Sequence, residues 1–182
     1  MLPAVALICL GAPAASGAGT RAGSSSCPGA GLSPSATNAT AVDAATLCLI
    51  DRVRAAHHLR PLRANRELQG VAARQAACMV RWDYFADECP SGQTAAALIA
   101  ATPYGAHAVR LSTGQNVGWG TGPFATPAQM VTAWMASPAH RAIILTRTFN
   151  DAGVGMTPAV PSADAGGERG ATYALELAAR RS

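Results

Sequence analysis

The sequence predicts an α+β domain in which helices come first and strands come late. Apolar residues recur at helical spacing between residues 41 and 101, whereas "AGVGMTPAV" and "TYALELA" near the C-terminus indicate two strands joined by a polar loop. No internal repeat is visible, and strands do not alternate with helices as they do in a doubly wound sheet. The 182 residues correspond to about one domain, which is long enough to bury a sizeable core.

Residues 1–18 are typical of a secretory leader, because an apolar core, Leu2–Leu10, is followed by a small-residue exit site, Ala15–Gly17. No arginine or lysine precedes this core, so the true translation start stays open. The core is shorter than the roughly 20 residues that a membrane-spanning helix needs. We therefore expect a secreted protein without a transmembrane span in its mature form. A Gly/Ser/Pro-rich arm is expected over residues 19–40 and one folded domain over residues 41–182.

Removal of the leader would remove Cys9 and leave four cysteines, an even number that favours disulfides in an exported chain. Three pairings of these four are open, and we expect the two sequence-local pairs, Cys27–Cys48 and Cys78–Cys89. The first pair would pin the N-terminal arm onto a helix, and the second would tie a helix to the loop after it. No Cys-x-x-Cys motif or Cys/His ligand pair occurs, so zinc is not expected.

The first helix is expected over about residues 41–57, where apolar residues fall on one stripe. Asn65 is a good N-cap for a second helix, whose apolar face would include Trp82. A short third helix is expected from Thr94 to Ala101. The segment "QNVGWG", residues 115–120, then indicates a strand.

The segment "TPAQMVTAWMASP" gives the clearest local signal in the chain. Thr126 can cap a helix, Pro127 fits the first helical position, and Gln129 completes a capping box. Trp134 falls on the inward face of this helix. We expect both Trp119 and Trp134 to lie in the core.

A second helix follows at once, with Ser137 at the N-cap and Pro138 at the first helical position. The Ser137 hydroxyl is expected to accept a hydrogen bond from the backbone N–H of Ala139 or His140. His140 would then lie near the positive end of the helix dipole, which favours a neutral imidazole. Such a ring can be a ligand, a base, a hydrogen-bond relay or a structural residue, and the residues alone leave these alternatives open.

Charge and motifs exclude several other functions. The net charge is +4, and all 14 basic residues are arginine because the chain contains no lysine. These arginines are spread along the chain without interleaved aromatic residues, so no nucleic-acid partner is expected. Neither a G-x-S-x-G nucleophile elbow nor a phosphate-binding loop occurs.

Several segments, taken in order, resemble the CAP superfamily of cysteine-rich secretory, antigen 5 and pathogenesis-related 1 proteins, and in particular its bacterial secreted SCP-like branch. These segments are "GQNVGWG", "TPAQMVTAWMASPAHRAIIL" and "NDAGVGM". Upstream, "LCLIDRVRAAHHLRPLRANRELQGVAARQAACMV" and "YFADECPSGQT" resemble the first two helices of the family and the loop after them. The resemblance covers about residues 41–179 and implies an α–β–α sandwich with a central, mainly antiparallel sheet, so that residues 41–182 form a CAP domain.

The resemblance also implies a cavity that gathers histidines and acidic residues, sometimes around a divalent metal. His140 matches the histidine of the family's S-P-x-H-R motif, whereas Gln115 stands where the glutamate of G-E-N is usual. Asp87 takes the place of the usual loop histidine, with Glu88 as the alternative, and Ser137 falls near a second acidic position. One histidine, one carboxylate and one amide make a weak ligand set. We therefore expect no metal or other cofactor, with divalent-metal binding as an alternative.

The function predicted from these residues is that of a secreted, non-catalytic binding module with a degenerate cavity. Its expected ligand is a component of the extracellular space or cell envelope, such as a lipid or sterol, or another protein. The expected cavity residues are His140, Gln115, Asp87, Ser137 and Trp134. The alternative is a secreted hydrolase that uses His140 with Asp87 or Ser137. The identity of the ligand and the oligomeric state stay open.

Overall fold

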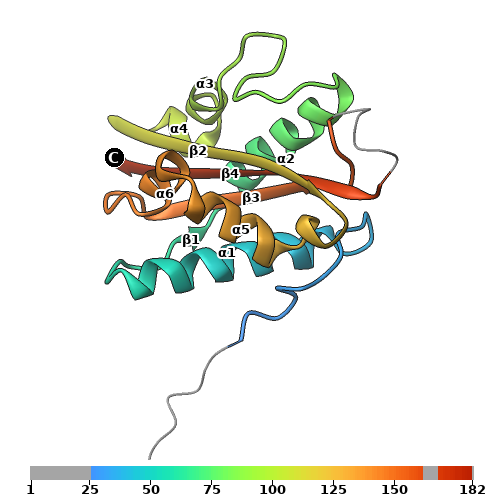
Figure 1. Ribbon diagram of the computed structural model, residues 1–182. Coiled ribbons are helices and arrows are strands. Elements are labelled where there is room, and N and C mark those ends of the chain that lie inside the picture. The colour runs from blue at the N-terminus through green and yellow to red at the C-terminus, as the bar shows by residue number, and fades with distance from the viewer. Residues whose placement is uncertain (1–25, 162–167, 182) are drawn as a thin grey trace, which may run out of the picture.

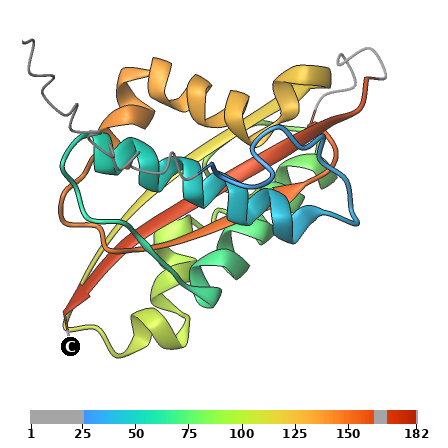
Figure 2. The same cartoon turned by 90° about the horizontal axis from the view of Figure 1, so that it is seen from below.

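The computed structural model describes residues 26–161 and 168–181, which form three layers. In chain order the elements are α1 (Ala39–Ala56), β1 (Arg63–Ala64), α2 (Arg66–Arg81), α3 (Ala95–Ala100), α4 (Pro103–Ala106), β2 (Arg110–Thr121), the 3-10 helix η1 (Gly122–Ala125), α5 (Pro127–Ala136), α6 (Pro138–Ile144), β3 (Asp151–Thr157) and β4 (Gly170–Arg181). The sheet lies between α2, α3 and α4 on one face and α1, α5 and α6 on the other (Figures 1 and 2), which confirms the predicted α–β–α sandwich. The predicted leader lies outside the described residues, among which no helix is long and apolar enough to cross a membrane.

The sheet has four strands in the order β1–β3–β4–β2. β1 runs parallel to β3, whereas β4 is antiparallel to both β3 and β2, so the sheet is mainly antiparallel as expected. Along β4, Leu175 and Leu177 pack into the core shared with α1 and α5. Ala174 and Ala178 belong to the clusters formed with α2 and α3, and Glu176, which lies between them on the strand, shares that face.

Two predicted helix starts are confirmed. The Asn65 side chain accepts a hydrogen bond from the backbone N–H of Leu68 at 3.1 Å and caps α2. The Thr126 hydroxyl accepts one from the backbone N–H of Gln129 at 3.4 Å and caps α5. The elements α4 and β1 were missed, since runs of 4 and 2 residues are too short to show a period.

Helix α2 lies directly on the sheet because β3 carries glycine at two positions that face it. A Cβ atom at Gly153 would overlap the backbone of Gln69, and one at Gly155 would overlap the backbone of Ala73. Any side chain at these positions would push the helix and the sheet apart. Gly153 is the register partner of Glu176 on β4, so the close approach of α2 also covers this acidic residue.

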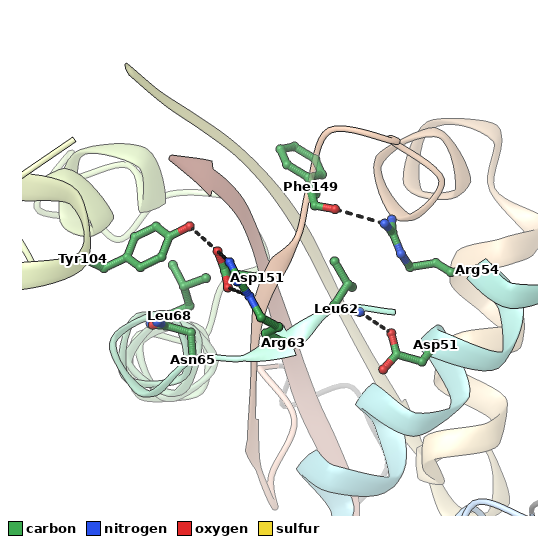
Figure 3. Close-up of polar contacts among 9 residues, drawn as sticks. All are labelled: Asp51, Arg54, Leu62, Arg63, Asn65, Leu68, Tyr104, Phe149 and Asp151. Atoms are coloured by element: carbon green, nitrogen blue, oxygen red, sulfur yellow. Dashed lines mark hydrogen bonds and ion pairs between the residues drawn. The ribbon is translucent and has the colours of Figure 1, made fainter. Parts of the chain in front are cut away.

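Arg54, in the last turn of α1, is completely buried and joins three other segments of the chain, of which Figure 3 shows the one that contains Phe149. Its guanidinium donates to the carbonyls of Ile144 and Thr146 at the end of α6, at 2.7 and 3.1 Å. It also donates to the carbonyl of Phe149, which precedes β3, at 3.0 Å, and to that of Arg60, which follows α1, at 3.0 Å. These charge-assisted bonds satisfy four backbone acceptors that lie outside regular secondary structure or at a helix end.

Asp151, the first residue of β3, is held by two neighbouring elements (Figure 3). Arg63 of β1 donates to the two carboxylate oxygens through Nε and Nη2, at 2.9 and 3.1 Å. Tyr104 of α4 donates its hydroxyl to Oδ2 at 2.8 Å, and burial together with this hydrogen bond raises the pKa of the phenol. The buried carboxylate therefore fixes two short elements to the start of β3.

The structure contains both predicted disulfides, Cys27–Cys48 and Cys78–Cys89. The first anchors the described part of the N-terminal arm to α1, and the second joins α2 to the loop before α3. Each closes a loop and so reduces the conformational entropy of the unfolded chain.

The expected burial of the tryptophans is correct for one of them. Trp134 is 2% exposed and lies in the core, whereas Trp82 and Trp119 are 58% and 40% exposed. The assignment of Trp82 to the apolar face of α2 was wrong because this residue is the C-cap, where the helical period has ended. Trp119 was wrongly expected in the core because β2 is an edge strand and Trp119 lies close to its end.

We expect Gly155→Ala to lower the free energy of unfolding by about 1–3 kcal/mol, because the added Cβ meets helix backbone rather than a flexible side chain. Gly70→Ala in α2 is the matched control, since a Cβ there meets nothing within 4 Å. This control should stabilise the protein by about 0.5–1 kcal/mol. Chemical denaturation followed by circular dichroism measures both, and equal stability of the two variants would contradict the close helix–sheet contact.

We expect Arg54→Met to lower the free energy of unfolding by about 3 kcal/mol or more, because it keeps most of the buried stem but leaves four carbonyls without a donor. Arg54→Lys should also destabilise, since a single ammonium lacks the planar fork that reaches separate carbonyls. Arg52→Met changes an exposed arginine of the same helix and should stay within about 0.5 kcal/mol of wild type. The same denaturation experiment measures all three variants. An unchanged midpoint for Arg54→Met would show that these hydrogen bonds contribute little to the free energy of unfolding.

Candidate functional site

A small pocket of about 200 Å³ lies between β2, β4, the start of α3 and the loop that precedes α3. Its lining consists of Asp87, Glu88, Thr94, Ala95, Ala96, Thr113, Gly114, Gln115 and Glu176. An isolated antiparallel bridge between Glu88 and Thr94 holds the loop in place. The pocket is therefore walled by small residues and polar side chains.

Glu176 and Gln115 form the central polar contact of this pocket. They are register partners on β4 and β2, and the Gln115 amide donates from Nε2 to Glu176 Oε1 at 2.8 Å. Glu176 is 0% exposed, and its second oxygen, Oε2, has no hydrogen-bond partner among the described residues. One of the two carboxyl oxygens is thus bonded to the amide, and the other is free to accept or donate.

Burial changes the acidity of this carboxyl group. Loss of hydration raises the pKa of Glu176 to about 8, against the opposing effect of the Gln115 hydrogen bond, and the negative charge of Asp87 raises it further. Glu176 is therefore mostly a neutral carboxylic acid near pH 7. A neutral acid is the form that a water-excluded strand position favours.

The structure places the predicted cavity residues in two layers. Asp87 and Gln115 line the pocket described above. His140 belongs to α6, on the other helical layer, and its backbone carbonyl accepts a hydrogen bond from Asn116 Nδ2 at 3.1 Å. Successive strand residues face opposite sides, so Asn116 is directed toward α6 while Gln115 is directed toward Glu176. Ser137 also lies in the second layer, at the junction of α5 and α6.

The expected hydrogen bond at the start of α6 was wrong. Ser137 occupies the N-cap with an extended backbone, but its hydroxyl makes no cap hydrogen bond. The same residue ends α5, where its N–H donates to the carbonyls of Ala133 and Trp134. Trp134 is part of the core, with its indole N–H donating to the carbonyl of Val117 at 2.9 Å, and it does not line the pocket.

The side chains present do not fit a divalent metal. Within residues 26–161 and 168–181, no three His, Cys, Asp or Glu side chains come together at a position that could hold an ion. Gln115, at the position where the resemblance places a glutamate, directs its amide nitrogen at Glu176, and an N–H donor is no ligand for a hard cation.

Glu176 was missed when the sequence was analysed. The signal that could have revealed it is its place in "TYALELA", where a charged residue interrupts an otherwise apolar strand. Glutamate is rarely buried without a partner, so a glutamate in an apolar central strand indicates that a polar group faces it.

The raised pKa predicts that the protein loses stability as the pH rises. The folded state keeps the Glu176 proton up to about pH 8, whereas the unfolded chain releases it near the ordinary value of 4.5. This group therefore stabilises the fold fully below about pH 4.5, and its contribution falls by about 1.4 kcal/mol per pH unit until about pH 8. Glu176→Gln should flatten this part of the pH profile, and Glu67→Gln, in the first turn of α2, should not. Denaturation midpoints between pH 5 and 8 test this, and identical slopes in all three proteins would contradict it.

Solved structures share this fold at low sequence identity. An extracellular protein containing an SCP domain from Bacillus anthracis superimposes with a TM-score of 0.61 and 18% identity, covering 78% of this chain and 41% of that one. An outer surface protein from Borrelia burgdorferi superimposes with a TM-score of 0.58 and 16% identity, and the match covers 74% of this chain and 90% of that one. A cysteine-rich secretory protein from Staphylococcus aureus superimposes with a TM-score of 0.56 and 18% identity, and the match covers 80% of this chain and 40% of that one. The chain thus spans less than half the length of the first and third of these proteins.

A family model identifies the sequence more directly than these structures. The model of the cysteine-rich secretory protein family matches residues 47–162, which is more than half of the chain. No curated protein sequence matches the chain. The matched residues include all the helices from α2 to α6 and most of the sheet described above. The chain therefore belongs to the cysteine-rich secretory protein, or CAP, family.

Proposed function

We propose that the protein is an extracellular binding module that holds its ligand at the pocket of Gln115, Glu176 and Asp87 and does not catalyse a reaction. The ligand would be a component of the cell envelope, a lipid or another protein. Two disulfides favour an oxidising compartment outside the cytosol. Two of the structural neighbours are an extracellular protein and an outer surface protein, which supports the same location.

The observation that carries the proposal is the hydrogen bond between Gln115 and Glu176. Catalysis by a nucleophile needs an activating base within hydrogen-bond reach. The pocket instead pairs a carboxyl group with an amide, which has no useful basicity and no nucleophilic atom. No hydrogen bond joins Ser137 to the His140 ring in the part of the chain that the structure describes. A fixed amide, a buried acid and nearby hydroxyl groups are the kind of polar groups that orient a bound molecule.

The proposal is tested on the exported protein. Native mass spectrometry should show a co-purified ligand, and Gln115→Leu, which removes the amide that orients Glu176, should reduce the fraction of loaded protein severalfold. His140→Ala changes a half-buried residue of the other layer and should leave that fraction unchanged. The melting temperatures of both variants show whether they remain folded.

A hydrolase would behave differently in the same comparison. Turnover of ester or peptide substrates that is lost in His140→Ala, while both variants keep their melting temperatures, would contradict the binding role. Such a result would favour a mechanism in which His140 acts with Asp87 or Ser137.

A further inference from the structure

The floor of the pocket carries an acidic group that the rest of the fold leaves incomplete. Glu176 is 0% exposed, lines the pocket, and has one oxygen, Oε2, without a partner among the described residues. An unpaired oxygen of a buried carboxyl group destabilises the folded state, and it does so more strongly when the group is charged. The two register partners of Glu176 offer no donor to this oxygen, because Gln115 is bonded to Oε1 and Gly153 has no side chain.

The ionisable residues that line the pocket are all acidic. Asp87 and Glu88 lie in the loop at the mouth of the pocket and are exposed to solvent. None of the described residues that line the pocket is cationic. Thr94 and Thr113 add hydroxyl groups that can accept or donate hydrogen bonds. The lining therefore offers several acceptors and a negative potential, with no positive group of the chain itself to balance them.

We infer that this pocket binds the positively charged head group of an organic ligand, a guanidinium or an ammonium, which donates to Glu176 Oε2 and is attracted by Asp87 and Glu88 at the mouth. This inference rests on the proposed function and names the ligand class of its pocket. The volume of about 200 Å³ suits a head group with a short stem rather than a whole drug-sized molecule. A guanidinium fits well, since its planar array of donors matches carboxylate acceptors.

A proton couples to this binding. Loss of hydration raises the pKa of Glu176 to about 8, so below that pH a cation must displace the proton from the carboxyl group. The titratable groups that face Glu176 are Asp87 and Glu88 in the loop, and the lining residues of β2 and α3 carry none. Affinity should therefore rise about tenfold per pH unit toward pH 8 and level off above it.

The test uses methylguanidinium chloride, which stays charged over the whole range, and methylurea as its uncharged counterpart. Isothermal titration calorimetry of the full exported chain at pH 6, 7, 8 and 9 should show saturable binding of methylguanidinium that strengthens up to about pH 8. Methylurea should bind at least tenfold more weakly at pH 9. Absence of methylguanidinium binding at pH 9, or equal binding of methylurea, would overturn the inference.

Three variants locate the binding. Glu176→Gln keeps the shape of the side chain and should lower affinity at pH 9 at least tenfold and remove the pH dependence. Asp87→Asn, at an exposed position that does not threaten folding, should weaken binding severalfold. Asp83→Asn removes the same charge from the same loop outside the pocket lining and should match wild type. Unchanged affinity in both Glu176→Gln and Asp87→Asn would overturn the inference even if one variant were unstable.

The outcome also separates this inference from the proposed function. If the exported protein carries a neutral or anionic ligand in native mass spectrometry and does not bind methylguanidinium, the binding role stands and the cationic head group is wrong. If the protein carries no ligand and binds neither probe, both are wrong.

Discussion

The contact of α2 with the middle of the sheet determines the character of the whole α2 face. Gly153 and Gly155 have no side chains to separate β3 from the backbone of α2, so the helix lies closer to the sheet than an ordinary side-chain layer would permit. Water is excluded from the strand positions beneath it, including Glu176 on the adjacent β4. The raised pKa of Glu176 is therefore mainly a consequence of burial under this helix, and the negative charge of Asp87 adds to it.

Two further buried ionisable residues in the described part of the chain, Arg54 and Asp151, hold the layers around that contact. Arg54 ties the end of α1 to the backbone between α6 and β3, and Asp151 ties β1 and α4 to the start of β3 (Figure 3). Every buried side-chain nitrogen and oxygen atom of these two groups has a hydrogen-bond partner, and most of these partners come from irregular or short segments, which have little stability of their own. They hold the start of β3 in place. The pairing of β3 with β4, and of β4 with β2, then places Glu176 opposite Gln115.

Local signals in the sequence predicted the α+β class and the helix starts, whereas the α–β–α sandwich was predicted from the resemblance to the CAP superfamily. Helix caps such as Asn65 and Thr126 depend on only a few neighbouring residues. The last two strands, β3 and β4, were likewise predicted from short apolar segments that follow the helices. The site was predicted less completely, because Gln115 meets Glu176 only through a strand register that joins positions 61 residues apart. Ser137 shows that a local pattern can also mislead. It has the sequence pattern of an N-cap and occupies that position, but it also ends the preceding helix, and its hydroxyl makes no cap hydrogen bond.

A fold selected only for stability would place an apolar residue at position 176. Its neighbours on the same face of β4, Ala174 and Ala178, are apolar and fully buried, and an alanine or leucine there would leave no oxygen without a partner. The resemblance to the CAP superfamily puts a carboxylate at position 115, where this chain has an amide. The acidic group is present one strand away, bonded to that amide and directed at the same small pocket. The carboxyl group with an unpaired oxygen therefore lies where a ligand could complete its hydrogen bonds, which is the arrangement expected of a binding site rather than of a residue that only fills the core.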